Sequence, residues 1–409
     1  MSRVSELLHQ AADLTLHRRR TLVVLSVGQV LSGISFGATV SLGAILAATI
    51  SGDDALSGLA TAAITLGTAA TSMPLAALAG RRGRAPALAS GMAVALLGVG
   101  LVIGAVPLGS FPTLLLGFAL IGAGQAANLQ SRFAATDLAT DASRGRDLSV
   151  VVWATTLGAV LGPNLVGPGE ALGHLVGMPE LTGPYLFTVA GQLSGIARYW
   201  FGLRPDPLLL ARKVALTHPG PAAALERADR PVAARYAMLA VVGAHGVMVS
   251  VMAMTPIHLL HHGATLTIVG LTISLHIAGM YGLSPVFGLL ADRWGRLRTI
   301  ALGYLILAGS ATVIALGASD PAWVTVALIL LGLGWSAATV AGAALLTEAS
   351  APEVRVRRQG RNDAAMSLLG ALGAIAAGGV LGWVGFAGLA LFTLPVIVLV
   401  VALAPLGRR

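Results

Sequence analysis

The sequence contains no cysteine and a single lysine, Lys213, and its acidic residues are few: 17 Asp and Glu against 26 Lys and Arg. The absence of cysteine excludes disulfides and thiolate metal sites. Lys213 does not stand in the Gly-Lys-Ser/Thr run of a nucleotide-binding loop, which argues against a nucleotide-driven pump. Only 11% of the 409 residues are charged, too few to cover a soluble protein of this size.

Hydrophobic residues make up 56% of the chain, and they occur in runs long enough for a helix to cross a bilayer. The runs Ala87–Val106 and Thr299–Gly317 lack the alternation of barrel strands. The 52 glycines suit close helix packing in a membrane. The composition therefore predicts an all-α polytopic membrane protein.

Hydropathy predicts twelve spans in two groups of six. They cover residues 21–49, 56–79, 86–106, 113–136, 149–168, 183–203, 234–257, 266–290, 299–317, 322–346, 365–383 and 385–405. We predict an N-terminal half at 1–203, a linker at 204–232 and a C-terminal half at 233–409. Apolar residues at helical spacing before residue 17 predict a short helix on the membrane surface.

The distribution of charge predicts the orientation. With the N-terminus inside, all 26 Lys and Arg fall in or beside cytoplasmic segments. The opposite loops carry only acids, namely Asp53, Asp54, Glu170, Glu180 and Asp320. We therefore expect a multi-pass inner-membrane protein with both termini cytoplasmic and no cleavable signal peptide. The net charge of +9 then reflects the bilayer as partner, and we expect no nucleic acid.

A basic loop motif occurs twice, about half the chain apart. One copy is Gly80-Arg-Arg-Gly-Arg84, and the other is Gly288-Leu-Leu-Ala-Asp292-Arg-Trp-Gly-Arg296. The second copy resembles the G-x-x-x-D-R-x-G-R signature of the major facilitator superfamily. In the first copy Gly80 stands where the Asp belongs, and Ala76 stands where the first Gly belongs.

This resemblance implies the major facilitator fold, with 12 transmembrane helices in two six-helix halves, and secondary transport by alternating access. It implies a site near the midplane between the duplicated halves. It also implies a cytoplasmic latch, carried mainly by the second half through Gly288, Asp292, Arg293, Gly295 and Arg296. The alternative is that this loop is merely basic and inside. We expect a transporter rather than an enzyme, no cofactor, and a monomer; a membrane sensor or scaffold is a minor alternative.

Two Met/His stripes are the most distinctive intramembrane feature. Met248 and Met252 in the seventh span, and His276 and Met280 in the eighth, are each spaced i, i+4 on one helix face. His245 joins the first stripe. Thioethers and imidazole form a soft ligand set suited to Cu(I). Taken singly, such residues are more often packing residues, and His276 is also a candidate for proton coupling.

An M-x-x-x-M followed by an H-x-x-x-M on these spans resembles the CcoA-like copper-importing branch of the superfamily. The flanking Met252-Ala-Met-Thr-Pro256 and Arg132-Phe-Ala-Ala-Thr-Asp137 agree with it. That resemblance implies metal binding by Met248, Met252, His276 and Met280, with copper as the transported substrate. Relatives with the same framework carry other cargo, so a proton-coupled transporter of a small organic compound, such as a drug or a riboflavin-like vitamin, remains the alternative.

Other polar residues have weaker signals. Met254, His258, His261 and His262 suggest an external capture site for copper, or else ordinary residues at a helix end. Arg132 is expected to pair with Asp137 or the cytoplasmic rim. The segment Gly158–Gly167 resembles in part a motif of antiporters. Buried amides are candidates for binding substrate or for joining helices: Gln29, Gln125, Asn128, Asn164 and Gln192.

Overall fold

The computed structural model describes residues 2–53, 56, 58–217 and 229–408. Nearly every described residue is helical, and the described part contains no strand. The chain divides into two compact units, Met1–Arg227 and Ala228–Arg409. The boundary lies within the predicted linker.

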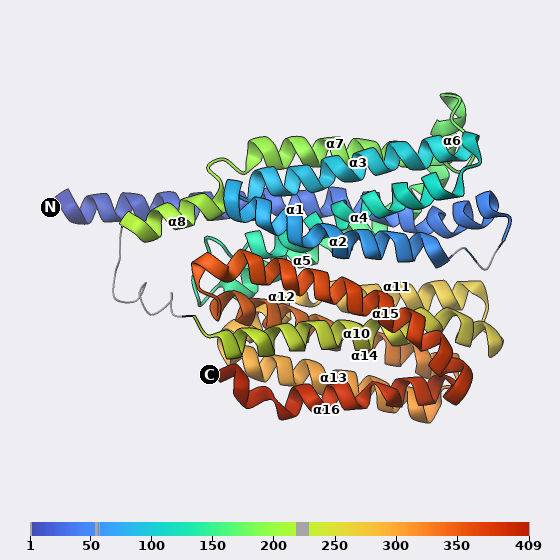
Figure 1. Cartoon of the computed structure of the whole chain (residues 1–409). Helices are drawn as coiled ribbons and strands as arrows, with labels where there is room; N and C mark the ends of the chain where they lie inside the picture. Colours follow the sequence, from blue (N-terminus) through green and yellow to red (C-terminus); the bar gives the residue numbers. More distant parts are fainter. Residues whose placement is uncertain (1, 54–55, 57, 218–228, 409) are drawn as a thin grey trace. The chain divides into compact units, whose positions relative to one another are not determined.

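Unit 1 is a helical bundle (Figure 1). Its helices are α1 (Ser2–Ser51), α2 (Gly58–Arg82), α3 (Arg84–Leu108), α4 (Phe111–Ala134), α5 (Arg144–Asn164), α6 (Val166–Leu175), α7 (Tyr185–Gly202) and α8 (Pro207–Thr217). The strongest packing pairs α3 with α4, α1 with α5 and α2 with α4, and α1 also packs against α7.

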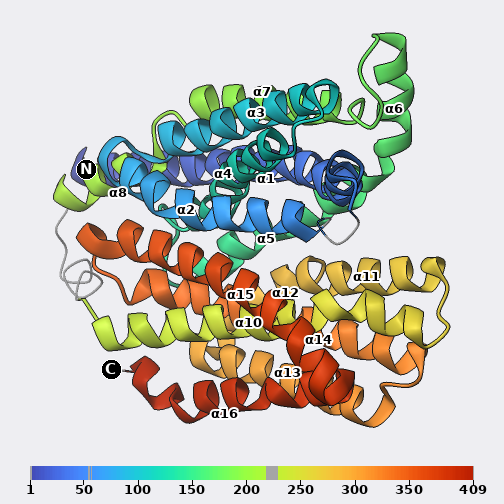
Figure 2. The same cartoon turned by 45° about the vertical axis from the view of Figure 1, so that its right-hand side comes forward.

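Unit 2 is a second bundle (Figure 2). It contains α10 (Pro231–His261), α11 (Leu266–Tyr281), α12 (Ser284–Trp294), α13 (Arg296–Gly317), α14 (Pro321–Glu348), α15 (Pro352–Phe392), α16 (Leu394–Ala402) and the 3-10 helix η2 (Ala404–Arg408). Helix α14 packs against α13, α11 and α10, and α15 packs mainly on α10. Unit 2 is thus organised around α10 and α14.

Each of the twelve predicted spans overlaps one or two α-helices of the described residues. Eight segments of the described residues are long and apolar enough to cross a membrane. The last of these, Pro352–Ala402, covers the predicted span 365–383 and most of the span 385–405. The chain kinks at the start of the second span, where Gly385 has a non-helical φ of 72°. Prolines at the first helical positions of α10 and α15 favour helix starts there.

Three boundaries differ from the sequence predictions. The expected separate surface helix before residue 17 is wrong, because α1 continues unbroken from Ser2 to Ser51. The linker contains α8, which hydropathy does not detect. Helix α15 begins at Pro352 rather than residue 365, so Asn362 and Asp363 lie inside a helix.

The two units repeat one helix crossing. In unit 1 a Cβ on Gly98 would lie 2.5 Å from the Gly117 carbonyl oxygen, where α3 crosses α4. In unit 2 a Cβ on Gly303 would lie 2.8 Å from the Gly334 carbonyl oxygen, where α13 crosses α14. Only glycine lets the two backbones approach this closely. The duplication seen in the loop motif therefore extends to the packing of the helices that follow it.

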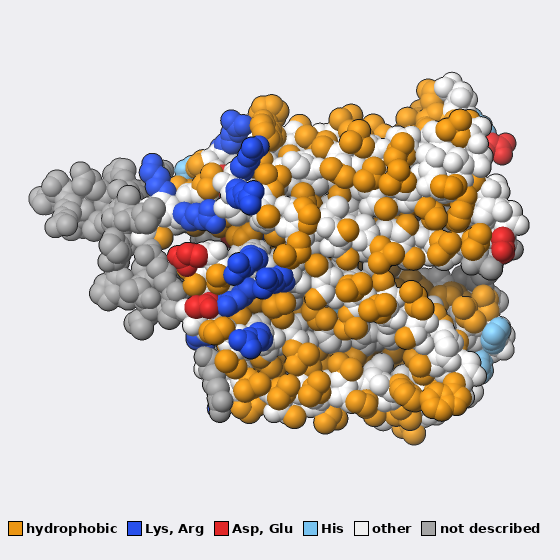
Figure 3. Space-filling model, in the orientation of Figure 1, with side chains coloured by type: hydrophobic (Ala, Val, Ile, Leu, Met, Phe, Trp, Pro, Cys, Tyr) orange, Lys and Arg blue, Asp and Glu red, His pale blue; other side chains and the backbone are white. Residues whose placement is uncertain are grey.

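Charge is segregated along the helices of each unit. Figure 3 shows, for each bundle taken by itself, the visible Lys and Arg side chains gathered at one end, with an apolar surface beyond them. In unit 1 this basic end is formed by the C-terminus of α2, the N-termini of α3 and α5, and the C-terminus of α7. In each unit we call the end where Lys and Arg gather the basic end. The assignment of the basic ends to the cytoplasmic side stays a prediction.

Candidate functional site

His276 lies in the seam between α11 and α14. Its side chain is 0% exposed, and its Nδ1 is 2.8 Å from the carbonyl oxygen of Leu328 on α14. A Cβ on Gly332 would lie 2.5 Å from the His276 carbonyl oxygen, so the two backbones touch here. Within the described part of the chain, the buried Nε2 atom of His276 has no hydrogen-bond partner. One ring nitrogen is therefore fixed, and the other is available.

The methionines predicted to join His276 are placed on two helices. Met280 is buried on α11, one turn after His276, and Met248 is buried on α10, while Met252 is half-buried. Helices α10 and α11 make little contact with each other, and each packs on α14 instead. The convergence of both pairs on one copper ion stays a prediction.

An aromatic cluster connects three helices of unit 2 near the second predicted stripe. Trp335 on α14 donates a hydrogen bond of 3.2 Å from Nε1 to Nδ1 of His245 on α10. The ring of Tyr281 on α11 meets the Trp335 ring edge-on, with centroids 5.7 Å apart. Trp335 is 5% exposed, whereas His245 and Tyr281 are half-buried. We call these three residues the aromatic cluster.

The neighbouring turn of α14 carries polar groups on a buried surface. Ser336 follows Trp335, and Thr339 lies one turn beyond it on the same face; both are buried. Their hydroxyls have no hydrogen-bond partner among the described residues. Since buried polar groups are normally paired, these hydroxyls are candidates for contact with a polar ligand. Sequence reasoning assigned no site role to Trp335, Ser336 or Thr339, because residues of these types in an apolar run have no distinctive spacing. Tyr281 was noted only as the residue that follows Met280.

The predicted external capture residues lie at the end of α10 and the turn after it, and their role in capture stays a prediction. His258 is buried, its Nε2 is 2.6 Å from the Ala318 carbonyl oxygen, and its ring stacks on Phe386 with centroids 4.2 Å apart. His261 and His262 are exposed. The described residues contain no group of three or more His, Asp or Glu side chains that could hold a metal ion. The geometry thus gives His258 a packing role at the helix end.

Two of the predicted amides of unit 1 join helices. Asn128 on α4 donates to Ser32 on α1 at 3.3 Å, and Gln29 on α1 donates to Thr155 on α5 at 3.2 Å. Gln125 keeps a buried oxygen without a hydrogen-bond partner in the described part, as does Gln192. The side chain of Asn164 lies outside the described residues.

The loop motif forms buried ion pairs in both units. In unit 2, Arg296 bonds Asp292 and lies 3.5 Å from a carboxylate oxygen of Glu348 at the end of α14. In unit 1, Arg84 bonds both oxygens of Asp137, just after α4, at 2.8 and 3.1 Å. Both arginines follow a glycine with positive φ, 97° at Gly83 and 103° at Gly295. In unit 2, Gly288 is buried and Arg293 is exposed.

These pairs leave two expectations open. Asp137 accepts from Arg84 through both carboxylate oxygens, and the pairing of Arg132 with Asp137 or with the cytoplasmic rim stays a prediction. The breaking of the Asp292 contacts during transport stays a prediction. The recurrence of one buried arginine and one acid at the same place in each unit indicates that the duplicated loop has the same structural role twice.

Asp206 supplies a carboxylate beside the loop copy that lacks its Asp. It accepts a hydrogen bond of 2.8 Å from the Ala85 N–H at the start of α3 and one of 3.0 Å from the Leu208 N–H at the start of α8. A Cβ on Gly83 would lie 2.5 Å from this carboxylate. Burial raises the pKa of Asp206, the hydrogen bonds from Ala85 and Leu209 oppose the rise, and the charge of Asp137 adds to it.

A buried acid in α15 was also missed by sequence reasoning. Asp363 is 0% exposed and accepts a hydrogen bond of 3.3 Å from the Asn362 amide. Acids inside membrane spans are candidates for function, but Asp363 lies just before the predicted span 365–383 and was therefore not considered. Proline is favoured at the first position of a helix, and a helix predicted to begin at Pro352 would have included Asp363.

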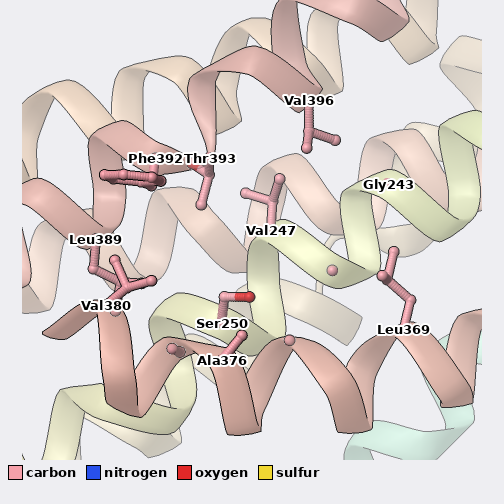
Figure 4. Close-up of a pocket in the computed structure, with 13 residues that line it drawn as sticks. Gly243, Val247, Ser250, Leu369, Ala376, Val380, Leu389, Phe392, Thr393 and Val396 are labelled. Atoms are coloured by element: carbon pink, nitrogen blue, oxygen red, sulfur yellow. The ribbon is translucent and has the colours of Figure 1, made fainter.

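A separate cavity in unit 2 lies between α10, α15 and α16 and has a volume of about 220 Å³. Figure 4 shows that the labelled side chains around it are apolar except Ser250 and Thr393. It offers hydrocarbon contacts and two hydroxyls, and none of the predicted Met or His ligands lines it. It is therefore a weaker candidate for the cargo site than the aromatic cluster.

Comparison with known proteins places the chain among transporters. The family model of the Major Facilitator Superfamily matches residues 25–272 and 237–408. The MFS-type transporter YddS of Bacillus subtilis is 36% identical over 86% of this chain and 83% of its own length. The riboflavin transporter RfnT of Brucella anthropi is 30% identical over 85% of each protein.

Solved structures share the fold. The human organic anion transporter MFSD10 superposes with a TM-score of 0.76 over 95% of this chain and 99% of that one, at 17% identity. The proton:xylose symporter XylE gives a TM-score of 0.74 over 95% of each chain, at 15% identity. At these identities the likeness concerns the fold alone.

Proposed function

Because the chain belongs to the major facilitator superfamily, and its family and relatives are secondary transporters rather than enzymes, we propose that it moves a small organic compound with a flat ring system, of the riboflavin class. The aromatic cluster is the observation that carries this proposal. The riboflavin transporter at 30% identity supports the same cargo class.

The chemistry of the cluster suits a flat heterocycle. The Trp335 and Tyr281 rings supply flat apolar faces and edges, with which an aromatic ligand makes stacked or edge-on contacts. The hydrogen bond from Trp335 to His245 fixes the orientation of the indole ring. Ser336 and Thr339 add hydroxyls for the polar groups of such a ligand.

Uptake of riboflavin into proteoliposomes containing the purified full chain tests the proposal, with flavin fluorescence as the readout. We expect uptake above empty vesicles, and a loss of roughly tenfold in Trp335→Ala, since ring contacts of this kind contribute about 0.5–1.5 kcal/mol beyond burial. Trp323→Ala is the matched control, because Trp323 is exposed on the same helix. Equal uptake by empty and protein-containing vesicles contradicts the proposal.

Copper import is the second candidate, and one observation favours it. A metal-binding histidine usually directs its other ring nitrogen to a carbonyl or carboxylate oxygen, and His276 has this arrangement, with Nδ1 at Leu328 and Nε2 available. Met280 lies one turn away on the same helix. Copper uptake by the same vesicles tests this candidate. Uptake that is lost in His276→Ala and kept in the exposed-site variant His262→Ala would identify copper as the cargo in place of an organic compound. Copper uptake no greater than in empty vesicles would contradict the copper hypothesis.

A further inference from the structure

A groove opens at the basic end of unit 1 between α1 and α7. Its volume is about 640 Å³, and its lining includes Leu16, Arg19, Arg20, Val23, Arg198 and Phe201. The two helices pack directly against each other and lie side by side in Figure 1 and Figure 2. The groove is separate from every residue assigned above to cargo.

The groove has a strong positive charge. Arg19, Arg20 and Arg198 are exposed, and none of them forms an ion pair with an acid in the described part of the chain. The neighbouring Arg18 differs, because Asp147 binds it at 2.5 and 2.7 Å. No acidic residue lines the groove. Three guanidinium groups therefore face an open cavity, and guanidinium is the side chain best suited to a phosphate oxygen.

The same groove has an apolar wall. Leu16 is 65% exposed, Val23 is 56% exposed and Phe201 is 69% exposed. On α1, Val23 lies one turn further into the predicted span than Arg19 and Arg20. A free phosphate ion would leave these surfaces unused, whereas a molecule with a phosphate and a hydrocarbon part would contact both.

The position of the groove along the helix also fits a lipid. Trp200 on α7 is 43% exposed, and the Arg204 guanidinium lies 5.6 Å from the centroid of its ring. Exposed tryptophan beside arginine is typical of the headgroup level of a membrane. The groove therefore lies where lipid phosphates are found.

A second basic cavity provides a contrast. In unit 2 a cavity of about 390 Å³ is lined by Arg230, Arg296, Arg298, Arg408 and Glu348. Arg230 is 2.9 Å from Glu348, and Arg296 is 3.5 Å from it, so the acid already neutralises part of that charge. The groove of unit 1 has no such acid among its lining residues.

We propose that the groove between α1 and α7 binds one anionic phospholipid, whose phosphate contacts Arg19, Arg20 and Arg198 and whose acyl chain lies on the apolar wall. This site is independent of the cargo. Basic pockets between transmembrane helices on the cytoplasmic side are a recognised way to hold lipid headgroups, and the predicted orientation puts the groove on that side.

Native mass spectrometry of the purified full chain, titrated in detergent with phosphatidylglycerol and with phosphatidylcholine of the same acyl chains, tests the proposal. We expect tighter binding of phosphatidylglycerol by the wild type. The triple variant Arg19→Gln, Arg20→Gln, Arg198→Gln should weaken it by about fivefold per arginine, on the order of 100-fold in total.

The matched control is the triple variant Arg81→Gln, Arg82→Gln, Arg357→Gln, which removes the same charge from exposed arginines outside the groove. Size-exclusion chromatography checks that both triple variants remain folded. If the triple variants do not remain folded, the single variant Arg198→Gln takes their place, with a fivefold loss of phosphatidylglycerol affinity expected. Equal loss in the control, equal binding of the two lipids, or no loss in the groove variant overturns the proposal.

Two further measurements separate a lipid from a free anion. Dihexanoyl phosphatidylglycerol, with short chains, should bind more weakly than dioleoyl phosphatidylglycerol, and inorganic phosphate at about 10 mM should not displace the long-chain lipid, because neither fills the apolar wall. Displacement by phosphate without dependence on chain length would make the groove an anion site and contradict the lipid proposal.

Discussion

Among single residues, Asp206 has the clearest predicted effect. Its carboxylate accepts from the first turns of both α3 and α8. Replacing an N-terminal cap by alanine costs about 1 kcal/mol at each helix, so Asp206→Ala should lower the free energy of unfolding by roughly 2 kcal/mol. The corresponding fall in melting temperature, a few degrees, is measurable from tryptophan fluorescence in detergent, since the chain contains six Trp.

The pH dependence of the same residue has a definite sign. Burial raises the pKa of Asp206 above its ordinary 3.8, so the folded chain holds this proton more tightly than the unfolded chain does. Its contribution to stability is therefore greatest at low pH and falls as the pH rises from about 4 through the folded pKa. Asp206→Asn removes this titration. The melting temperature of the variant, relative to that of the wild type, should therefore rise as the pH increases from about 4 through the folded pKa of Asp206, and then level off.

Glu353→Gln controls for the loss of one negative charge, because Glu353 is exposed. A melting-temperature difference between Asp206→Asn and the wild type that stays constant from pH 4 to pH 8 would contradict the assignment. So would an Asp206→Ala variant as stable as the wild type.

The sequence predicted least well which side chains contact one another in the site. The basic loops were found from spacing, yet the partner of Arg84 is Asp137, 53 residues away, and the partner of Arg296 on α14 is Glu348. Spacing places residues on a helix face, but the rotation of that helix against its neighbours depends on packing. For the same reason the stripes of Met and His were predictable as stripes, whereas the aromatic cluster was not.

At the scale of helices, the shared glycine crossing predicts which glycines are essential. Gly303 faces the backbone of α14, whereas nothing lies within 4 Å of a Cβ placed on Gly309 of the same helix. Gly303→Leu should therefore separate α13 from α14 and abolish a monodisperse protein, while Gly309→Leu should be tolerated. Size-exclusion chromatography after solubilisation measures this. Equal yields and profiles for the two variants would show that the crossing is not needed.

Helix positions were largely predictable, because a bilayer requires about 20 apolar residues per span. One exception, the start of α15, arises where a helix lies against protein rather than lipid. Asn362 and Asp363 are buried near the start of α15, so hydropathy begins the span later than the helix. The break before α12 follows from Pro285, whose ring cannot continue the hydrogen bonding of α11.

For the whole molecule, the orientation in the membrane is a prediction that rests on the distribution of charge. All 26 cationic residues belong to segments predicted to be inside, and a chain without cysteine lets single substitutions report on one position at a time. A membrane-impermeant maleimide applied to intact cells should label Ser319→Cys and Glu180→Cys, both exposed at the acidic ends. It should label Arg81→Cys and Arg357→Cys only after lysis. The loss of one arginine among 26 cationic residues is too small a change to invert the chain. Labelling of the two arginine positions in intact cells would therefore mean that the orientation is reversed, and the groove between α1 and α7 would then face the outer leaflet.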